Sequence, residues 1–448
     1  MKQVEWRYSN QQESWAAKQP SPYSGDHFDL TSNGLEYQRM LGFGGCFNEI
    51  GYAALLNSGE SVRSAILDEL FLPGDSRCNF NICRLPIGAS DYAHGWYSLD
   101  DVPGDLSLSN FSIERDKELL IPYIREAQRR APGMKLFASP WSPPAWMKLP
   151  PVYNGGRFNF KPEFRKCYAE YFVRFLREYA GEGIKIDQIH VQNEPVAKQK
   201  FPSCLWSGEE LRDFIRDDLG PAIQKSGIDT EIWLGTLNAP GCDYNRMIFD
   251  KWAAEDYDYF ANTVLTDEGA LQYITGVSYQ WGGKIAMQRT FQSWWPRLRL
   301  MQSESECGFG DNTWDYALYI WTMLKHYIEN GAESYLYWNM LLPPGGASAW
   351  GDFQNAMITI DADKKRACFN PDFYVMKHFS SCLKRGALRL GITGRFSGDS
   401  LMFRNPDGGV VLELYNPFTG IHSVSVLAEG EKYLFELEPR SVNSVVIT

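Results

Sequence analysis

Hydrophobic residues recur along the chain in short dense runs, and between these runs they are spaced three or four residues apart. Dense runs are typical of strands that are buried on both faces of a parallel sheet. The wider spacing is typical of helices with one apolar face. The predicted strands lie at 41–49, 80–88, 135–141, 186–195, 231–238, 274–281, 298–304 and 334–341, and the clearest helices at 59–71, 114–130, 163–182, 208–226 and 313–330, with Ser112 as the N-cap of the second helix.

Strands that alternate with helices in this way predict an α/β fold, a closed (β/α)8 TIM barrel with an outer ring of helices. A doubly wound parallel sheet shows the same alternation, and its nucleotide-binding members carry a Gly-rich phosphate loop after the first strand. The first predicted strand here reads "GFGGCF" at 42–47, which does not match that GxGxxG motif. We therefore favour the barrel.

The pattern changes at about residue 385, where short alternating segments are separated by turn signals such as "PDGG" at 406–409. Such alternation predicts antiparallel strands with one buried face. The N-terminal segment contains one more candidate strand, "GLEYQRML" at 34–41. We therefore divide the chain into an N-terminal segment (1–38) that joins the β-domain, a catalytic barrel (39–384) and a small antiparallel β-sandwich domain (385–448).

Net charge and apolar runs restrict the partners of the protein. A formal net charge of −11 argues against nucleic acid as a partner, because an acidic surface repels the phosphate backbone. No run of about 20 apolar residues predicts a transmembrane segment. The first residues, "MKQVEWRYSN", lack the apolar centre of a signal peptide, so we expect a cytoplasmic protein unless the chain is a processed mature form. Nothing in these patterns predicts an oligomeric state.

Cysteine and histidine usage does not indicate a metal site. The chain has six histidines without an HExxH motif, and its nine cysteines are irregularly spaced and form no CxxC pair. Such a pattern favours reduced thiols over a disulfide framework or a zinc site. We therefore expect neither a metal nor a cofactor. The cysteines are at positions 46, 78, 83, 167, 204, 242, 307, 368 and 382.

Two of the predicted strands end in a glutamate directly after apolar residues, in "HVQNE" at Glu194 and "LMQSE" at Glu304. The active site of a (β/α)8 barrel lies at the carboxyl ends of its strands. Each glutamate alone could be a solvated rim residue. Placing two ionisable groups at the ends of buried strands costs free energy, however, so a function is expected for the pair. Two carboxyls facing each other across a barrel mouth suit glycoside hydrolysis, in which one protonates the leaving oxygen and the other attacks the sugar.

Several longer motifs accompany the two glutamates. They are "GFGGCFNE" (42–49), "NICRLPIGASDY" (81–92), "ASPWSPPAWMK" (138–148), "VQNEP" (191–195), "RDDLGPAI" (216–223) and "YWNMLLPPGG" (337–346). Together with the C-terminal β-domain, they resemble glycoside hydrolase family 30, in the clan of retaining barrel glycosidases that includes glucosylceramidase. The resemblance covers nearly all of the chain, and it implies that Glu194 is the acid/base and Glu304 the nucleophile.

The resemblance also implies roles for residues around the two glutamates. Arg84 would keep the nucleophile ionised, and Asn193 would bond the 2-hydroxyl of the sugar. Asp91 and Trp146 would contact the innermost sugar, and Trp338 would form its floor. Without the resemblance, Arg84 could equally form a structural ion pair, and Trp146 could belong to the hydrophobic core. Many of the 15 Trp could likewise be core residues. The predicted substrate-binding residues are Arg84, Asp91, Trp146, Asn193, Trp281, Trp338 and Asn339.

A second glutamate, Glu306, lies two residues after Glu304. Alternation along a strand cannot separate them, because residues two apart share a face. We favour Glu304 because it directly follows the apolar run, whereas Glu306 lies further into the loop. The chain departs from the family after the sixth strand. Members often have a Tyr there that bonds the nucleophile, whereas this chain has Gly282, and Tyr279 has the opposite strand parity.

The sequence therefore predicts a retaining β-glycoside hydrolase that acts on a carbohydrate or glycoconjugate. An exo-acting β-glucosidase, similar to glucosylceramidase and acting on a small β-glucoside, is the first choice. Endo-β-1,6-glucanase, β-xylosidase and β-fucosidase activities of the same family are alternatives. A non-catalytic carbohydrate-binding barrel is the alternative from another class, and the presence of both glutamates argues against it.

Overall fold

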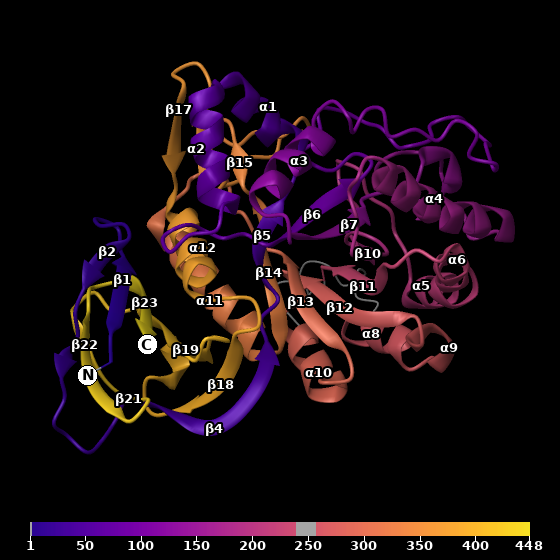
Figure 1. The fold of residues 1–448 in the computed structure, drawn as a ribbon. Helices are drawn as coiled ribbons and strands as arrows, with labels where there is room; N and C mark the ends of the chain where they lie inside the picture. Colours follow the sequence, from indigo (N-terminus) through magenta and orange to yellow (C-terminus); the bar gives the residue numbers. More distant parts are fainter. Residues whose placement is uncertain (1, 239–256) are drawn as a thin grey trace.

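The computed structural model describes residues 2–238 and 257–448. Within them the chain forms a closed barrel of parallel strands and a separate curled sheet that is mostly antiparallel, as Figure 1 shows. The predicted fold class is therefore confirmed. No helix of the described part combines the length and apolar character that crossing a bilayer requires.

The eight barrel strands coincide with the eight predicted runs, so the hydrophobic pattern located every one of them. Neighbouring strands pair in parallel, in the order β5, β6, β7, β10, β11, β12, β13, β14 and back to β5. The strands are β5 (Gly42–Cys46), β6 (Ile82–Ile87), β7 (Lys135–Pro140), β10 (Gln188–His190), β11 (Glu231–Leu237), β12 (Ile274–Gln280), β13 (Arg299–Glu304) and β14 (Ala332–Asn339).

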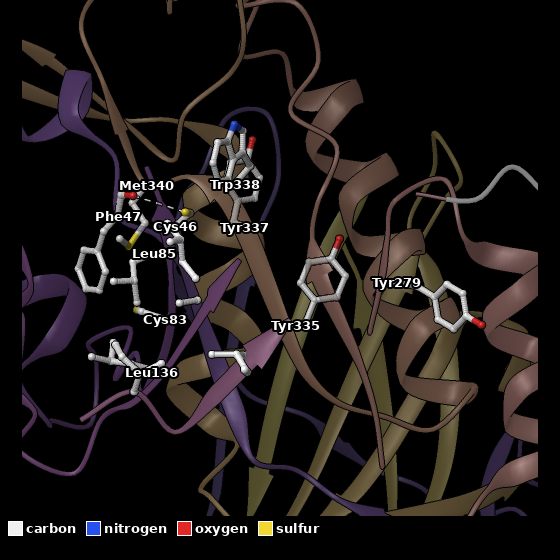
Figure 2. Close-up of a cluster of buried hydrophobic side chains, with 14 of the residues drawn as sticks. Cys46, Phe47, Cys83, Leu85, Leu136, Tyr279, Tyr335, Tyr337, Trp338 and Met340 are labelled. Carbon is white, nitrogen blue, oxygen red and sulfur yellow. Dashed lines mark hydrogen bonds between the residues drawn. The ribbon is translucent and has the colours of Figure 1, made fainter. Parts of the chain in front are cut away.

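Side chains alternate between the inside of the barrel and the layer beneath the helices. An inner apolar cluster of Ile82, Phe137, Trp233, Met301 and Leu336 fills the barrel, with one side chain from each of five strands. On four of these strands the next residue belongs to a separate outer cluster: Cys83, Ala138, Leu234 and Tyr337. Figure 2 shows part of the outer cluster, with side chains from β5, β6 and β7 packed together. Burial on both faces explains why these strands read as nearly continuous apolar runs.

Helices surround the barrel and also line the loops at its ends. The predicted helix at 208–226 forms, although α5 passes into α6 through a π-helical segment, Ile215–Leu219, just before Pro221, which has no N–H to donate. The helices are α1 (Glu49–Asn57), α2 (Glu60–Phe71), α3 (Leu120–Arg130), α4 (Pro162–Gly181), α5 (Gly208–Phe214), α6 (Gly220–Ser226), α8 (Tyr257–Leu265), α9 (Glu268–Leu271), α10 (Lys284–Trp294), α11 (Trp314–Glu329) and α12 (Pro371–Cys382).

The predicted cap of the second helix is wrong. Helix α3 begins at Leu120, eight residues after Ser112, and Leu119 occupies its N-cap position. Ser112 instead accepts a hydrogen bond from the backbone of Glu114, which closes a local turn. The intervening turns hold the buried Asp116, which accepts hydrogen bonds from two tyrosine hydroxyls. These tertiary contacts keep the segment from joining the helix.

The second unit is one hydrogen-bonded sheet in the order β2, β1, β23, β20, β19, β18, β4, β21, β22, β3. All neighbours are antiparallel except β4 and β21. N-terminal strands therefore do complete it, and its curvature encloses a core that includes Trp6, Leu412 and Phe435. The strands are β1 (Val4–Ser9), β2 (Ala16–Lys18), β3 (Ser21–Pro22), β4 (Leu30–Arg39), β18 (Leu388–Thr393), β19 (Ser400–Arg404), β20 (Val410–Asn416), β21 (His422–Ala428), β22 (Glu431–Leu437) and β23 (Ser441–Ile447).

Short strands and 3-10 turns complete the fold. A two-stranded pair lies in the loop after β7, and a three-stranded sheet follows β14. They are β8 (Lys148–Leu149), β9 (Arg157–Phe158), β15 (Leu341–Leu342), β16 (Ile358–Asp361) and β17 (Arg366–Phe369), with 3-10 turns at Ala145–Met147 and Ser397–Asp399.

Helix α12 packs the barrel against the curled sheet, as seen to the left of centre in Figure 1. Its buried His378 bonds Ser444 of β23 through Nδ1 (2.8 Å) and Ser9 of β1 through Nε2 (2.9 Å). Ser444 in turn donates to the buried Glu413 of β20 (2.6 Å). We call these four residues the interface cluster.

Candidate active site

Arg84 lies at the centre of the polar cluster at the carboxyl ends of the strands. It is fully buried on β6, where its neighbours on either side, Cys83 and Leu85, belong to the outer layer. Its guanidinium donates to Glu304, to Ser139 Oγ (2.9 and 3.1 Å) and to Asn193 Oδ1 (2.6 Å). It also lies 4.4 Å from the ring centroid of Trp141. These contacts compensate for the burial of the cation.

A register shift between β12 and β13 aims Glu304 at this cluster. Tyr279 pairs with Gln302, but the next residue of β12, Gln280, pairs with Glu304, so Ser303 is an extra residue on β13. Met301 points into the barrel, and strict alternation would have placed Ser303 inward instead of Glu304. A bulge of this kind re-aims the side chain that follows it. Simple alternation along the sequence cannot show such a shift.

Gln280 supplies a second donor to Glu304. Its Nε2 lies 2.9 Å from Glu304 Oε2, 2.8 Å from Asn193 Oδ1 and 3.0 Å from Thr236 Oγ1. Tyr279 faces the other way and bonds Thr290 of α10 (2.7 Å), as its strand parity indicated. Gln280 therefore donates to Glu304 where the family often uses a tyrosine hydroxyl, and sequence reasoning had assigned it no role.

Asn193 and Glu194 follow β10, which ends earlier than predicted, at His190. The backbone continues beside the neighbouring strands, because Asn193 N donates to Pro140 O and Glu194 N to Thr236 O. Glu194 has a φ of 44°, in the left-handed region that a non-glycine residue rarely adopts. Strain of this kind is held only where surrounding contacts enforce it, and it is frequent at functional sites.

The two glutamates have different donors. Glu194 is buried and accepts from two neutral amides, Asn238 Nδ2 on Oε1 (2.8 Å) and Gln199 Nε2 on Oε2 (3.2 Å). Burial raises the pKa of Glu194 to about 7, and the charge of Glu304 adds to that rise. Burial also raises the pKa of Glu304, but the Arg84 guanidinium opposes this rise. Only Glu304 accepts a hydrogen bond from the guanidinium, so this contact favours the charge on Glu304 over Glu194.

Asp91, Trp338 and Asn339 lie beside this cluster. The indole N–H of Trp338 donates to Asp91 Oδ2 (3.2 Å), and the Trp338 ring packs against Trp141 with centroids 5.2 Å apart. Burial and the charges of Glu304 and Glu194 raise the pKa of Asp91 well above its ordinary value. Asn339 is fully buried and bonds Asn48 and Gln354, so it supports the surrounding loops.

The other two predicted tryptophans have different surroundings. Trp146 donates its indole N–H to the backbone of Asp100 and packs against Phe164 of α4. Its neighbour in the same motif, Trp141, is the one that packs on Arg84 and Trp338. Trp281 is half-buried. Its backbone N–H donates to Glu304 O (3.0 Å), which ties the residue after β12 to the end of β13. Sequence reasoning had assigned Trp141 no role, although it lies within the motif at 138–148.

Glu306 lies in the loop after β13 has ended and is half-buried. The described residues hold no group of three or more His, Cys, Asp or Glu side chains arranged for a metal ion. Eight cysteines are free thiols, and Cys242 lies outside the described residues.

A closed (β/α)8 barrel with two largely buried carboxyls, one in the segment after β10 and one at the end of β13, is the arrangement of a barrel glycoside hydrolase. The family model described as the glycosyl hydrolase family 30 TIM-barrel domain matches residues 40–383. The chain therefore belongs to glycoside hydrolase family 30, and it is a glycoside hydrolase that acts on carbohydrate.

Individual relatives agree with this family. Lysosomal acid glucosylceramidase of Mus musculus is 29% identical, over 85% of this chain and 75% of that protein. An endo-1,6-beta-D-glucanase of Neurospora crassa is 28% identical, over 93% and 86%. Among solved structures, SrfJ from Salmonella typhimurium is similar with a TM-score of 0.87 and 26% identity, over 99% of both chains.

Proposed function

We propose that the protein hydrolyses β-glycosides with retention, with Glu304 as nucleophile and Glu194 as acid/base. One observation carries the proposal: two carboxyls that are at most 12% exposed share one cluster, but only Glu304 accepts from a guanidinium. This asymmetry keeps one carboxyl charged and the other protonated near neutral pH, as double displacement requires.

In the first step, a carboxylate oxygen of Glu304 forms a bond to the anomeric carbon. The bond from that carbon to the leaving oxygen breaks, and its electron pair goes to that oxygen. Glu194 gives its proton to the same oxygen, so the leaving group departs as a neutral alcohol. Glu304 is then an ester and no longer carries charge, so the pKa of Glu194 falls and the residue becomes a base.

In the second step, Glu194 takes a proton from water while the water oxygen bonds to the anomeric carbon and the bond to Glu304 breaks. The two inversions restore the β configuration. Neither step needs a metal or a cofactor. Three donors fix the orientation of Asn193 by bonding its Oδ1, which leaves its Nδ2 to donate to the 2-hydroxyl of the sugar.

For the substrate we propose a β-glucoside cleaved from its non-reducing end. The glucosylceramidase relative supports a glucosyl group in the innermost subsite. Endo-β-1,6-glucanase activity is the second candidate, supported by the Neurospora crassa relative. Hydrolysis of aryl β-glucosides, β-xylosides and β-fucosides, compared with that of linear β-1,6-glucan, separates these activities, and no turnover of any of them would favour the carbohydrate-binding alternative.

A mechanism-based label tests the proposal. A 2-deoxy-2-fluoro β-glucoside with a good leaving group slows both steps, so the glycosyl-enzyme accumulates. We expect peptide mapping to place the label on Glu304, and NMR to show β-glucose as the first product from an ordinary substrate. A label on Glu306, or a first product with the α configuration, would overturn the mechanism.

A further inference from the structure

Three aromatic side chains from separate loops gather at the same end of the barrel as the carboxyl pair. Trp96 follows β6, Tyr153 follows β7, and Trp350 follows β14. The rings of Trp96 and Tyr153 are stacked with centroids 5.5 Å apart, and Trp350 meets Trp96 edge to face at 5.2 Å. We call these three residues the aromatic platform. Trp96 is 39% exposed, and the other two are half-buried.

The platform is attached to the loop that follows Glu194. Lys148, which is 1% exposed, donates to the backbone carbonyls of Tyr153 (3.1 Å) and Ser203 (2.7 Å). Ser203 also donates its backbone N–H to Tyr153 O (3.1 Å). These bonds hold the Tyr153 loop against the segment that carries Gln199, the amide donor to Glu194.

Trp350 is linked to the same loop by a second contact. Lys200, the neighbour of Gln199, forms a salt bridge of 2.8 Å with Asp352, two residues after Trp350. The acid/base residue protonates the leaving oxygen, so the leaving group lies on the side of Glu194. Both attachments therefore place the platform beside the loop that borders the leaving group.

We propose that the aromatic platform binds a glycosyl unit of the leaving group, so that the protein prefers β-linked saccharides over glucosides of small alcohols. The inference rests on the proposed function, because it takes Glu194 as the acid. Flat aromatic faces bind the apolar face of a sugar ring, whose hydroxyls need polar partners at its edge. Polar groups do border this platform: the Tyr153 hydroxyl bonds Asp101 (3.0 Å), and the Lys200–Asp352 pair is partly exposed. A lipid chain would leave these groups without a role.

Binding to an inactive protein tests the platform without turnover. In the Glu304→Gln background, isothermal titration compares a β-1,6-linked glucose disaccharide with methyl β-glucoside, which lacks the second sugar. We expect the disaccharide to bind more tightly, and Trp96→Ala combined with Trp350→Ala to weaken it about tenfold relative to the methyl glucoside. Trp96→Tyr, which keeps a flat ring, should retain most of the affinity.

Turnover gives a second measure with Glu304 intact. β-Glucosyl fluoride has a minimal leaving group, so the ratio of kcat/KM on the disaccharide to kcat/KM on the fluoride reports leaving-group binding. The double substitution should lower this ratio about tenfold. Phe418→Ala removes an aromatic side chain that is 52% exposed on the curled sheet, and it should leave the ratio unchanged.

The two proposals fail in different ways. Equal affinity for disaccharide and methyl glucoside, or a disaccharide affinity that the double substitution leaves unaltered, would overturn the platform even if aryl glucosides are hydrolysed. If the double substitution weakens the binding of octyl β-glucoside and leaves the binding of the disaccharide unchanged, the platform binds a lipid chain and the proposal is overturned. A protein that hydrolyses no β-glycoside at all would contradict the proposed function, whereas the titration still decides the platform.

Discussion

The cluster around Arg84 and the interface cluster around His378 both bury glutamate, yet their chemistry differs. Glu304 accepts hydrogen bonds from a guanidinium and an amide, so the positive charge of Arg84 opposes the rise in pKa that burial causes. Glu413 accepts one serine hydroxyl, its Oε1 has no partner among the described residues, and its pKa is raised well above the ordinary value by burial. Burial also lowers the pKa of His378, to about 3. The interface cluster is therefore a chain of neutral hydrogen bonds.

This contrast shows that burial alone does not create a reactive carboxylate. Burial raises the pKa of a carboxyl group in either place, and the set of donors decides whether charge is retained. The neutral hydrogen-bonded chain stabilises the contact between β1, β20, β23 and α12. In the Arg84 cluster, by contrast, the guanidinium favours an ionised Glu304, which is available as a nucleophile. The same Glu→Gln substitution should therefore affect activity in one region and the pH dependence of stability in the other.

The largest effect is expected for Glu304→Gln. An amide cannot attack the anomeric carbon, so kcat on an aryl β-glycoside should fall about 10⁴-fold or more. Glu306→Gln is the matched control, because Glu306 lies past the end of β13, and its kcat should stay near that of the wild type. Steady-state kinetics of both variants check the assignment, and a greater loss in Glu306→Gln would reverse it.

Gln280→Ala should reduce kcat/KM about 10- to 100-fold, because Glu304 and Asn193 both lose a donor. A donor to the carboxylate lowers its pKa, so its removal should raise the pKa of Glu304 and move the acidic limb of the pH–rate profile to higher pH. Gln280→Glu would place a second acid beside Glu304 and should move the limb further. A uniform loss at every pH would mean that Gln280 serves only the fold.

Glu413→Gln tests the interface cluster through stability. A group whose pKa is raised in the folded state holds its proton there and loses it when unfolded, so the free energy of unfolding falls as pH rises above about 4.5. The slope is about 1.4 kcal/mol per pH unit while the folded protein keeps the proton. Because His378, whose pKa is lowered to about 3, gives the opposite slope below about pH 6.5, the quantity to measure is the difference between the two proteins. Urea unfolding between pH 5 and about pH 8 should show that the wild type loses unfolding free energy relative to Glu413→Gln, by up to about 1.4 kcal/mol per pH unit, with unchanged kcat. An unaltered slope would mean that Glu413 is ionised in the folded protein.

The smallest effect is expected for Gln199→Ala. Gln199 donates to Glu194 and thereby lowers its pKa, which burial otherwise raises to about 7. The acid must be protonated, so kcat/KM should decline above about pH 7 in the wild type, and the variant should hold its activity to a pH higher by a few tenths of a unit. A basic limb that stays in place would assign the proton to another group.

Strand positions and the two carboxyls could be predicted from sequence because both depend on local pattern. Barrel strands buried on both faces read as apolar runs, and glutamates that end such runs stand out against them. Helix α3 shows the limit of local pattern: its spacing continued back towards Ser112, but hydrogen bonds to Asp116 from distant tyrosines keep that segment in turns.

The sequence by itself determined the positions of the eight barrel strands, five of the helices and the two glutamates that follow apolar runs, because burial imposes a period that can be read along the chain. Tertiary structure alone decided which way those residues face. The extra residue Ser303 turns Glu304 towards Arg84, Gln280 takes the place of a tyrosine donor, and Trp141 rather than Trp146 packs beside Arg84. Pairing register and contacts between distant loops set these orientations, and neither leaves a periodic signal in the sequence.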